Sequence, residues 1–455
     1  MKMYWLAAVM LPLILGGCEA YQAKPLNMDA DMPHRIPRIT VGAAEIPLLR
    51  HEAHPFNPDD GLDITDVAIL AVVNNPELKL ARDDAGIARA QAFDAGLLPN
   101  PQLAAGLDFP SSSTSGSNYT ATSLGVSYDW TSLLTRNAAV GAAKKKVRKY
   151  DLVILWREWQ VIGEARRLFA QSYYQNRLAK TLTAYRNLLA DRYHHVRQAF
   201  KDGNVTLNTS GADLAALAGM DRQIAELNRQ RLKTHYELTR LLGVAPDVAL
   251  PLVGDVMLPH MDKSRIDAML SELAYRRPDM LALKAGYEAQ DLKYREAIIR
   301  QFPAISISIA RASDTSNVET IGPSIALSLP ILNHHEGKVA VEKATRKRLY
   351  DEFENRLAGA RSAISEILKD QRLLKTQLEA VQASKQSLED AVNAAEKAYA
   401  AGDMDEMIYV TLNSRLLDKT LEQIRLEQAV VGQRIALQTL LGTGACQAFN
   451  NEGNS

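Results

Sequence analysis

Residues 304–309, Ala-Ile-Ser-Ile-Ser-Ile, alternate strictly between apolar and small side chains. The stretch Ile-Gly-Pro-Ser-Ile-Ala-Leu-Ser-Leu at residues 321–329 alternates in the same way. Because successive side chains of a strand point to opposite faces, this period of two predicts two strands with one apolar face each. The polar segment between them, residues 312–320, predicts an exposed loop, so the pair is expected to form a hairpin.

A second pair of alternating stretches lies in the first half of the chain, at residues 102–109 and 123–130. The Ser, Thr, Gly and Asn residues of segment 110–120 predict the loop between them. Asp108 and Asp129 both fall on the small, polar side of the alternation. Four strands in two hairpins are therefore predicted, each with an apolar and a polar face.

The alternation alone leaves two interpretations open. A soluble antiparallel sheet also has one buried and one wet face. Transmembrane strands alternate in the same way but carry aromatic side chains at the membrane interfaces. Tyr128 and Trp130 stand at the end of one apolar row, which favours the membrane interpretation.

The first 17 residues have the features of a secretory signal: Lys2, an apolar run from Tyr4 to Leu15, and small residues before a cysteine. The run is too short to span a bilayer as a helix. The ending at Cys18 resembles a bacterial lipoprotein signal, in which the cysteine becomes the acylated first residue, carrying palmitate. The next residue, Glu19, is not the aspartate associated with inner-membrane retention, so this resemblance implies delivery to the outer membrane. No uncharged apolar run of 18 or more residues follows Leu15, and a second membrane contact would then be made of strands.

Composition excludes several classes of protein. The 455 residues include 53 Lys plus Arg and 53 Asp plus Glu, and a nucleic-acid-binding protein would need a surplus of basic groups. The hydrophobic share of 47% and charged share of 23% are typical of a globular chain. The two cysteines, Cys18 and Cys446, cannot form a disulfide framework or a Cys-x-x-Cys zinc site.

Proline placement predicts long helices. Ten prolines lie between residues 25 and 110 and seven between residues 246 and 330, whereas segments 111–245 and 331–455 contain none. Because proline breaks a helix at a cost of about 3 kcal/mol, those two segments can hold uninterrupted helices. Steps of four and three residues predict a coiled-coil seam at Phe353, Leu357, Ala360, Ile364, Ile367, Gln371, Leu374, Leu378, Val381, Lys385, Leu388, Val392, Ala395 and Tyr399.

The chain also repeats its landmarks. Asn-Pro-Glu-Leu at 75–78 and Arg-Pro-Asp-Met at 277–280 each lead, over the same distance, to a proline and then to a hairpin. Each half reads helix, hairpin, long helix, turn and shorter helix, which predicts an internal duplication. The predicted organisation is a signal peptide (1–17), a lipidated N-terminal extended segment (18–61), a first structural repeat (62–243), a linker (244–263), a second structural repeat (264–443) and a C-terminal tail (444–455).

Four transmembrane strands cannot close a barrel, since the smallest bacterial barrels have eight and open edges in lipid leave backbone groups unpaired. Two copies would give eight strands, whose interior side chains essentially fill. Three copies give twelve strands and a lumen. The expected fold class is therefore mixed α and transmembrane β, with four strands per protomer completing a 12-stranded trimeric β-barrel on a long α-helical barrel.

The quoted landmarks resemble the outer-membrane efflux protein family, the TolC-like channels. The resemblance covers about residues 60–443. Its runs Leu-Leu-Pro-Asn-Pro at 97–101 and Leu-Pro-Ile-Leu-Asn at 329–333 are similar to the lipoprotein branch that serves heavy-metal and drug efflux pumps of the RND type. His334 and His335 depart from the charged or amide pair often found in that branch.

This resemblance implies a homotrimeric, passive exit duct in the outer membrane with its helical barrel in the periplasm. The implied partners are a periplasmic adaptor, an inner-membrane pump and outer-membrane lipid. The helical-hairpin tips expected to meet the adaptor are Gly203, Asn204, Val205, Thr206, Gly402, Asp403 and Met404. The acidic residues expected at a periplasmic gate are Asp403, Asp405 and Glu406; solvation of acids near a turn is the open alternative for them.

No motif indicates an enzyme, a cofactor or a metal site. The chain has no Gly-rich phosphate loop, Gly-x-Ser-x-Gly elbow or His-Glu-x-x-His sequence. The adjacent pairs His194-His195 and His334-His335 point to different faces and are expected to be structural or solvated. Two further functions stay open at this point, namely the outlet of a type I protein secretion system and a non-conducting, lipid-anchored periplasmic coiled-coil scaffold.

Overall fold

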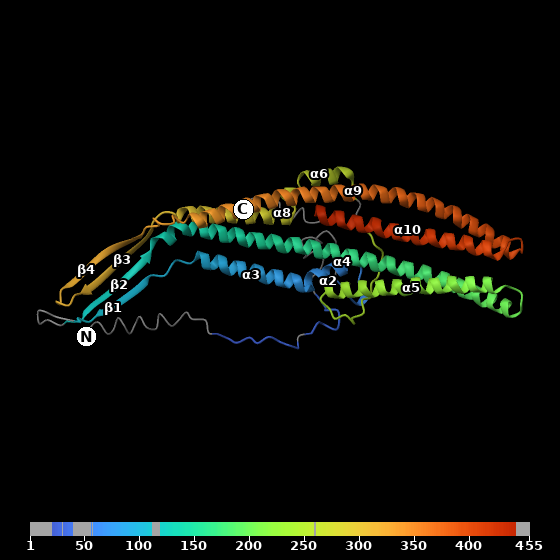
Figure 1. Ribbon diagram of the computed structural model, residues 1–455, viewed down its shortest axis with the longest axis horizontal. Helices are drawn as coiled ribbons and strands as arrows, with labels where there is room; N and C mark the ends of the chain where they lie inside the picture. The colour runs from blue at the N-terminus through green and yellow to red at the C-terminus, as the bar shows by residue number, and fades with distance from the viewer. Residues whose placement is uncertain are drawn as a thin grey trace.

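The protein is elongated, with a small sheet at one end and the turns of two helical hairpins at the other (Figure 1). The computed structural model describes residues 21–29, 31–39, 56, 58–111, 119–258 and 261–442. The predicted signal peptide, the lipidation site Cys18 and the C-terminal tail lie outside these residues. None of the helices in the described ranges combines the length and apolar character needed to cross a membrane.

The element order helix, strand, strand, long helix, helix occurs twice. In the first half these elements are α3 (Pro76–Gly96), β1 (Gln102–Asp108), β2 (Ala121–Asp129), α4 (Trp130–Lys201) and α5 (Leu207–Leu241), preceded by η2 (Pro58–Asp60) and α2 (Ile64–Asn74). In the second half they are α8 (Pro278–Ile299), β3 (Ala304–Ser313), β4 (Glu319–Ser328), α9 (Glu336–Ala400) and α10 (Glu406–Leu441), preceded by α6 (Lys263–Ser271) and α7 (Leu273–Arg276). The long helix α4 has 72 residues, which at 1.5 Å per residue is about 108 Å.

The four predicted strands are confirmed, and they form one antiparallel sheet in the order β1-β2-β3-β4. The central pairing joins the two halves of the chain, with Val126 of β2 opposite Ile309 of β3. The outer pairings are the two hairpins, with Leu103 opposite Val126 and Ile309 opposite Pro323. Strands β1 and β4 are consequently the two edges of the sheet.

The junction between β2 and α4 corrects one detail of the prediction. Trp130 was expected to end the strand, but it is the first residue of α4. The Asp129 carboxylate accepts hydrogen bonds from the backbone N–H groups of Thr131 and Ser132, and this N-cap starts the helix directly. The Thr131 hydroxyl in turn accepts the backbone N–H of Ile305, which fastens β3 to the same turn.

The helical part consists of two hairpins packed side by side, α4 with α5 and α9 with α10, and α4 and α10 face each other between them (Figure 1). The buried side chains at the interface between the two hairpins come from α4, α5 and α10. Examples are Leu182, Met220 and Leu421. Along α9 the predicted seam is buried at Ala360, Ile364, Val381, Val392 and Ala395.

The middle of the molecule holds the largest apolar core, where α2, α4 and the end of α5 meet the linker after α5. Leu62 pairs with Leu252 in an isolated parallel bridge. The N-terminal segment packs against the same core through Ile36 and Ile39. The backbone N–H of Ala245 donates to the carbonyl of Pro33 at 2.9 Å, so this extended segment is tied to the linker.

Equivalent landmarks of the two halves make equivalent contacts. The Asn75 side chain caps α3 and donates to the Leu241 carbonyl at the end of α5. Arg277, at the corresponding position before α8, donates to the Leu440 carbonyl at the end of α10. Each landmark thus ties the start of one helix to the last turn of the helix that closes its own half.

Candidate functional site

The apolar face of the sheet is continuous across all four strands. Its cross-strand rows contain Leu103, Val126, Ile309 and Pro323, then Tyr128, Ile307 and Ile325. Most of these side chains are exposed, with Ile325 at 67% and Ile309 at 54%. Soluble proteins rarely expose a contiguous apolar patch of this kind, so it marks a surface that meets an apolar partner or lipid.

The opposite face carries small and polar side chains. One cross-strand row consists of Gln102, Ser127, Ser308 and Ser324, and the next of Ala104, Gly125, Ala310 and Gly322. The hydroxyls of Ser308 and Ser324 are hydrogen bonded at 2.7 Å. Asp108 and Asp129 lie on this face, as the alternation predicted. The sheet therefore has an apolar side and a hydrophilic side, and none of the described helices covers either face.

One ion pair interrupts the apolar face near the loop end. Arg311 lies opposite Leu124 and Ile321, and its guanidinium donates to the Glu319 carboxylate at 2.5 Å. The sequence prediction ended the apolar row of this strand at Ile309 and placed residues 312–320 in a loop. The ion pair with Glu319 compensates the charge of Arg311, and β3 continues to Ser313.

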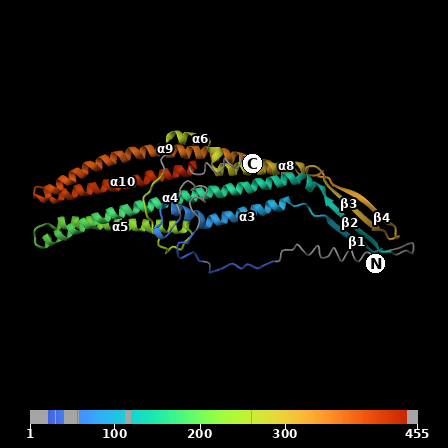
Figure 2. The same cartoon turned by 180° about the vertical axis from the view of Figure 1, so that it is seen from behind.

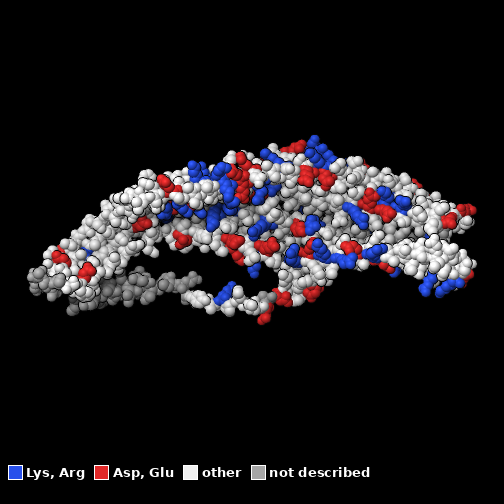
Figure 3. All heavy atoms as spheres, viewed as in Figure 1, with Lys and Arg blue, Asp and Glu red and all other residues white. Residues whose placement is uncertain are grey.

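Exposed apolar and aromatic residues flank the sheet at both ends. Phe109 and Tyr119 lie toward the loop between β1 and β2, while Trp130 and Phe302 lie where strands meet helices. In the space-filling view, Lys, Arg, Asp and Glu side chains gather over the helices and are sparse over the strand end (Figure 3). An apolar band with aromatic borders is the pattern of transmembrane strands.

The first hairpin tip, between α4 and α5, contains the predicted residues Gly203 to Thr206. Gly203 has φ +75°, a conformation that favours glycine. Its N–H donates to the Phe200 carbonyl, and the N–H of Asn204 donates to that of Ala199, so the turn is a Schellman motif. Thr206 caps α5. Three of these four predicted residues are exposed, and Val205 is half-buried.

The second tip, between α9 and α10, has the same backbone. Gly402 has φ +79°, its N–H donates to Tyr399, and the N–H of Asp403 donates to Ala398. Asp405 caps α10 through a 2.7 Å hydrogen bond from the Met407 N–H. Asp403 and Asp405 are exposed. Glu406 begins α10, but its side chain lies outside the described part of the structure.

The tips differ in charge and in their side-chain contacts. Basic side chains gather at the α4–α5 tip and acidic ones at the α9–α10 tip (Figure 3); Arg197 and Lys201 are exposed at the former. Across the second tip the rings of Tyr399 and Tyr409 stack with centroids 5.3 Å apart. This stack was not predictable from the seam, because Tyr409 lies outside it.

A buried ion pair joins the two helices of the first hairpin. Arg192 of α4 donates to Asp213 of α5 at 3.0 Å, and both side chains are less than one-tenth exposed. Spacing within a single helix could not reveal this pair, because the two residues meet only after the chain reverses at Gly203.

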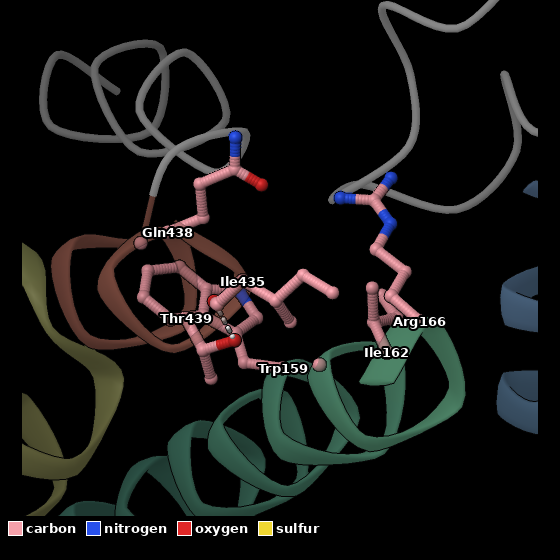
Figure 4. A pocket seen from close by; sticks show the side chains of 8 residues that line it. Trp159, Ile162, Arg166, Ile435, Gln438 and Thr439 are labelled. Carbon is pink, nitrogen blue, oxygen red and sulfur yellow. Dashed lines mark hydrogen bonds between the residues drawn. The ribbon is translucent and has the colours of Figure 1, made fainter. Parts of the chain in front are cut away.

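A small pocket marks the crossing of α4 and α10 (Figure 4). Trp159, Ile162 and Arg166 line it from α4, and Gln438 and Thr439 from α10. A Cβ atom on Gly163 would clash with Thr439, and one on Gly442 would clash with the Trp159 ring. The helices therefore touch closely here, and the pocket is a gap beside this contact.

The two histidine pairs lie on a helix and in a turn. His194 and His195 are exposed on α4. His334 and His335 both have positive φ and form the turn between β4 and α9. Within the described ranges, no group of three or more His, Cys, Asp or Glu side chains is placed to hold a metal ion.

Residues 269–443 match the model of the outer membrane efflux protein family. The resemblance to this family inferred from the sequence landmarks is thereby confirmed for the second half of the chain. No curated protein matches the sequence significantly.

Solved structures of outer-membrane proteins match 84% to 94% of the chain. The Campylobacter jejuni CmeC outer membrane channel has a TM-score of 0.72 and 16% identity, covering 94% of this chain and 94% of that chain. The Vibrio cholerae outer membrane protein VceC has a TM-score of 0.68 and 17% identity, covering 84% and 96%. The open state of the Neisseria gonorrhoeae MtrE outer membrane channel has a TM-score of 0.65 and 16% identity, covering 84% and 89%. At these identities the likeness shows the fold.

Proposed function

We propose that the protein is the outer-membrane channel of a tripartite efflux system, a passive exit duct for small toxic solutes. The observation that carries this proposal is the uncovered sheet, which has one exposed apolar face, one small and polar face, and two unpaired edges. A sheet of this kind can be satisfied in lipid only when its edges are paired. The channels with the same fold support the proposal.

Three copies complete the sheet in this proposal. Edge strand β4 of one protomer pairs with edge strand β1 of the next, which gives twelve strands in a closed barrel. The apolar rows then face lipid, and the rows that contain Ser308 and Gly125 face the lumen. Small side chains in these rows leave the lumen open, whereas eight strands would enclose a filled interior.

The helical hairpins form the periplasmic part of the duct. Their length of about 100 Å reaches far from the membrane. In this proposal their tips meet a periplasmic adaptor and, through it, an inner-membrane pump that supplies the energy. The protein itself is proposed to be non-enzymatic and to need no cofactor. Acylation at Cys18 would add a lipid anchor to the strand contacts.

Extraction from outer membranes, followed by planar-bilayer recording, tests this function. We expect heat-modifiable trimers that conduct, and loss of resistance to a toxic solute when the chain is deleted. Loss of protein export with intact resistance would favour a secretion outlet instead. A detergent-free soluble monomer without conductance would contradict the duct and favour a scaffold.

A further inference from the structure

Two charged side chains, Arg311 of β3 and Glu319 of β4, lie on the apolar face of the described sheet. All other members of that face in the four described strands are uncharged. The two side chains form an ion pair but stay 66% and 63% exposed, and an exposed pair adds little stability. A charge on a lipid-facing strand is costly, so its presence there indicates a function.

The cross-strand row of Arg311 is the boundary between an apolar and a polar part of this face. The neighbouring row on the helix side is apolar and consists of Val126, Ile309 and Pro323. The neighbouring row on the loop side is polar and consists of Thr122, Ser313 and Glu319. The apolar band therefore ends at Arg311, and side chains that can form hydrogen bonds follow directly.

The hydroxyls of this polar row have donor capacity beside the arginine. Those of Thr122 and Ser313 are hydrogen bonded to each other at 2.9 Å, and the Ser313 hydroxyl also accepts the backbone N–H of Thr122 at 3.3 Å. Each hydroxyl has one proton to donate, and the bond between them uses one of the two. A guanidinium has five N–H donors, and Nη2 of Arg311 donates to Glu319. The guanidinium and a hydroxyl can thus both donate to a further acceptor.

The loop end of this hairpin lies at the level of lipid headgroups in the proposed duct. In both views the turn between β3 and β4 lies at the opposite end of the molecule from the helical-hairpin tips (Figures 1 and 2). Arg311 stands seven residues after Ala304, the first residue of β3, which is about 24 Å of strand and about 18 Å of height at a tilt of about 40°. Because an apolar band is about 25 Å tall, Arg311 lies in its upper part, from where a long side chain reaches the headgroups.

We propose that Arg311, together with the hydroxyls of Thr122 and Ser313, binds the phosphate of a lipid headgroup in the outer leaflet. This inference rests on the proposed function, which places the loop end of the strands in that leaflet. A guanidinium matches phosphate oxygens with two parallel N–H donors, and a hydroxyl adds a neutral donor. Each protomer of the duct carries one such site on its lipid-facing side.

One carboxylate competes with the phosphate. Residues 304–328 contain two acids, Asp314 and Glu319. The Asp314 carboxylate accepts the backbone N–H groups of Ser316 and Val318, each at 2.9 Å, so it is engaged in the turn. Glu319 is the acid that shares the guanidinium of Arg311 with a bound phosphate.

Binding of lipid A, a glycolipid with phosphates on its sugar headgroup, tests the site. Native mass spectrometry of trimers that conduct is carried out with a chelator present, which removes divalent-cation bridges between phosphate and carboxylate. We expect lipid A to bind at least about tenfold more tightly than its dephosphorylated form, since the charged hydrogen bonds are lost with the phosphate. Inorganic phosphate should not displace it.

Two substitutions with opposite expected effects separate a lipid site from a simple ion pair. Arg311→Gln should weaken lipid A binding by about tenfold or more, whereas Glu319→Gln should strengthen it because the competing carboxylate is gone. Thr122→Val keeps the side-chain shape and should weaken binding by a smaller factor. The matched control, Arg229→Gln, breaks an exposed ion pair on helix α5 and should leave binding unchanged.

A variant that keeps the lipid-facing side free of an unpaired charge covers poor assembly of Arg311→Gln. The double variant Arg311→Gln/Glu319→Gln carries no charge at this place and should bind lipid A as weakly as its dephosphorylated form. Binding of lipid A by this variant at the strength of the unmodified protein would overturn the site.

Two further results reject the lipid site and leave the duct standing. The first is equal binding of lipid A and its dephosphorylated form by conducting trimers. The second is displacement of lipid A by inorganic phosphate, which would assign the site to a free anion. A preparation that never yields a conducting trimer rejects the duct and the lipid site together.

Discussion

The side chain of Arg277 contacts both Asp279 and Trp156. The contact with Trp156 could not be read from the Arg-Pro-Asp motif. Its guanidinium makes two hydrogen bonds to the Asp279 carboxylate, at 2.9 and 2.8 Å. It also lies 4.6 Å from the ring centroid of Trp156. Both charged side chains are about 95% buried. Removing Arg277 leaves the buried Asp279 carboxylate with only the half-exposed guanidinium of Arg356, 3.8 Å away, as a charged partner.

We expect Arg277→Ala to lower the free energy of unfolding by about 3 to 5 kcal/mol. The exposed pair of Arg229 with Glu226 supplies the control, since Arg229→Ala should cost at most about 1 kcal/mol. Chemical denaturation in detergent measures both. Equal effects of the two substitutions would show that the buried pair does not stabilise the middle of the molecule.

Gly163 is required by the close contact of α4 with α10. We expect Gly163→Ala to destabilise the protein by about 1 to 3 kcal/mol, because its Cβ would meet Thr439 and overpack the crossing. Gly432 on α10 has nothing near its missing Cβ, so Gly432→Ala should be neutral or stabilising by up to about 1 kcal/mol. Thermal unfolding measures the stability of the two variants. An unchanged stability of Gly163→Ala would contradict a close contact between α4 and α10 at this residue.

The N-terminal segment contacts the linker after α5 through His34 and Asp247, and the charge of His34 depends on pH. A hydrogen bond to Asp31 raises the pKa of His34, and the carboxylates of Asp31 and Asp247 reinforce the shift. A raised pKa means that the folded state binds the proton more tightly, so this contribution is complete below the unfolded value of about 6.5. It is lost as the pH rises through the higher folded pKa.

Hydrogen exchange at Ala245 reports this fastening, since its N–H donates to Pro33. After correction for intrinsic rates, we expect slower exchange at pH 6 than at pH 8, and we expect His34→Ala to abolish the difference. Protection that is the same at both pH values in the unmodified protein would exclude the histidine contact as the cause.

At the scale of elements, the sheet is tested by charge placed on either face of one strand. Ile307 lies on the apolar face of β3, and Ser308, its neighbour, lies on the polar face. Ile307→Arg should cost about 2 to 4 kcal/mol if the residue is near the bilayer midplane, whereas Ser308→Arg should be tolerated. The fraction of chains in heat-modifiable trimers measures both, and normal assembly of Ile307→Arg would contradict the assignment of the apolar face to lipid.

The elements were predictable where their signal is local. Alternation located the four strands, and the proline-free segments and the seam of α9 located the long helices. The pairing of β2 with β3 was not predictable, because it joins segments about 180 residues apart in the chain. The start of α4 at Trp130 was missed because the Asp129 cap overrides the alternation, and the extension of β3 was missed because Glu319 compensates Arg311.

At the scale of the whole molecule, the acidic tip is proposed to restrict the closed duct. Asp403→Ala combined with Asp405→Ser should raise leak conductance by removing carboxylates, which repel one another and favour cations. Serine keeps an N-cap for α10, so helix fraying is not expected to cause the effect. Bilayer recording of the variant measures the leak, and an unchanged closed-state current would remove both residues from the gate.

The site was predictable from sequence only in part. Gly203 and Gly402 were located because positive φ at a reversal favours glycine, and the structure places both at the tips. Arg192 with Asp213 and the Tyr399–Tyr409 stack were not found, because each pair forms across a hairpin.

Single-channel recording of the purified protein in planar lipid bilayers tests the central claim most directly. If protomers pool their strands into one barrel, a preparation shown to be trimeric should give uniform conductance steps, one per trimer. Trimers that insert into the bilayer but give no steps, or a chain that remains a monomer in water without detergent, would contradict the account.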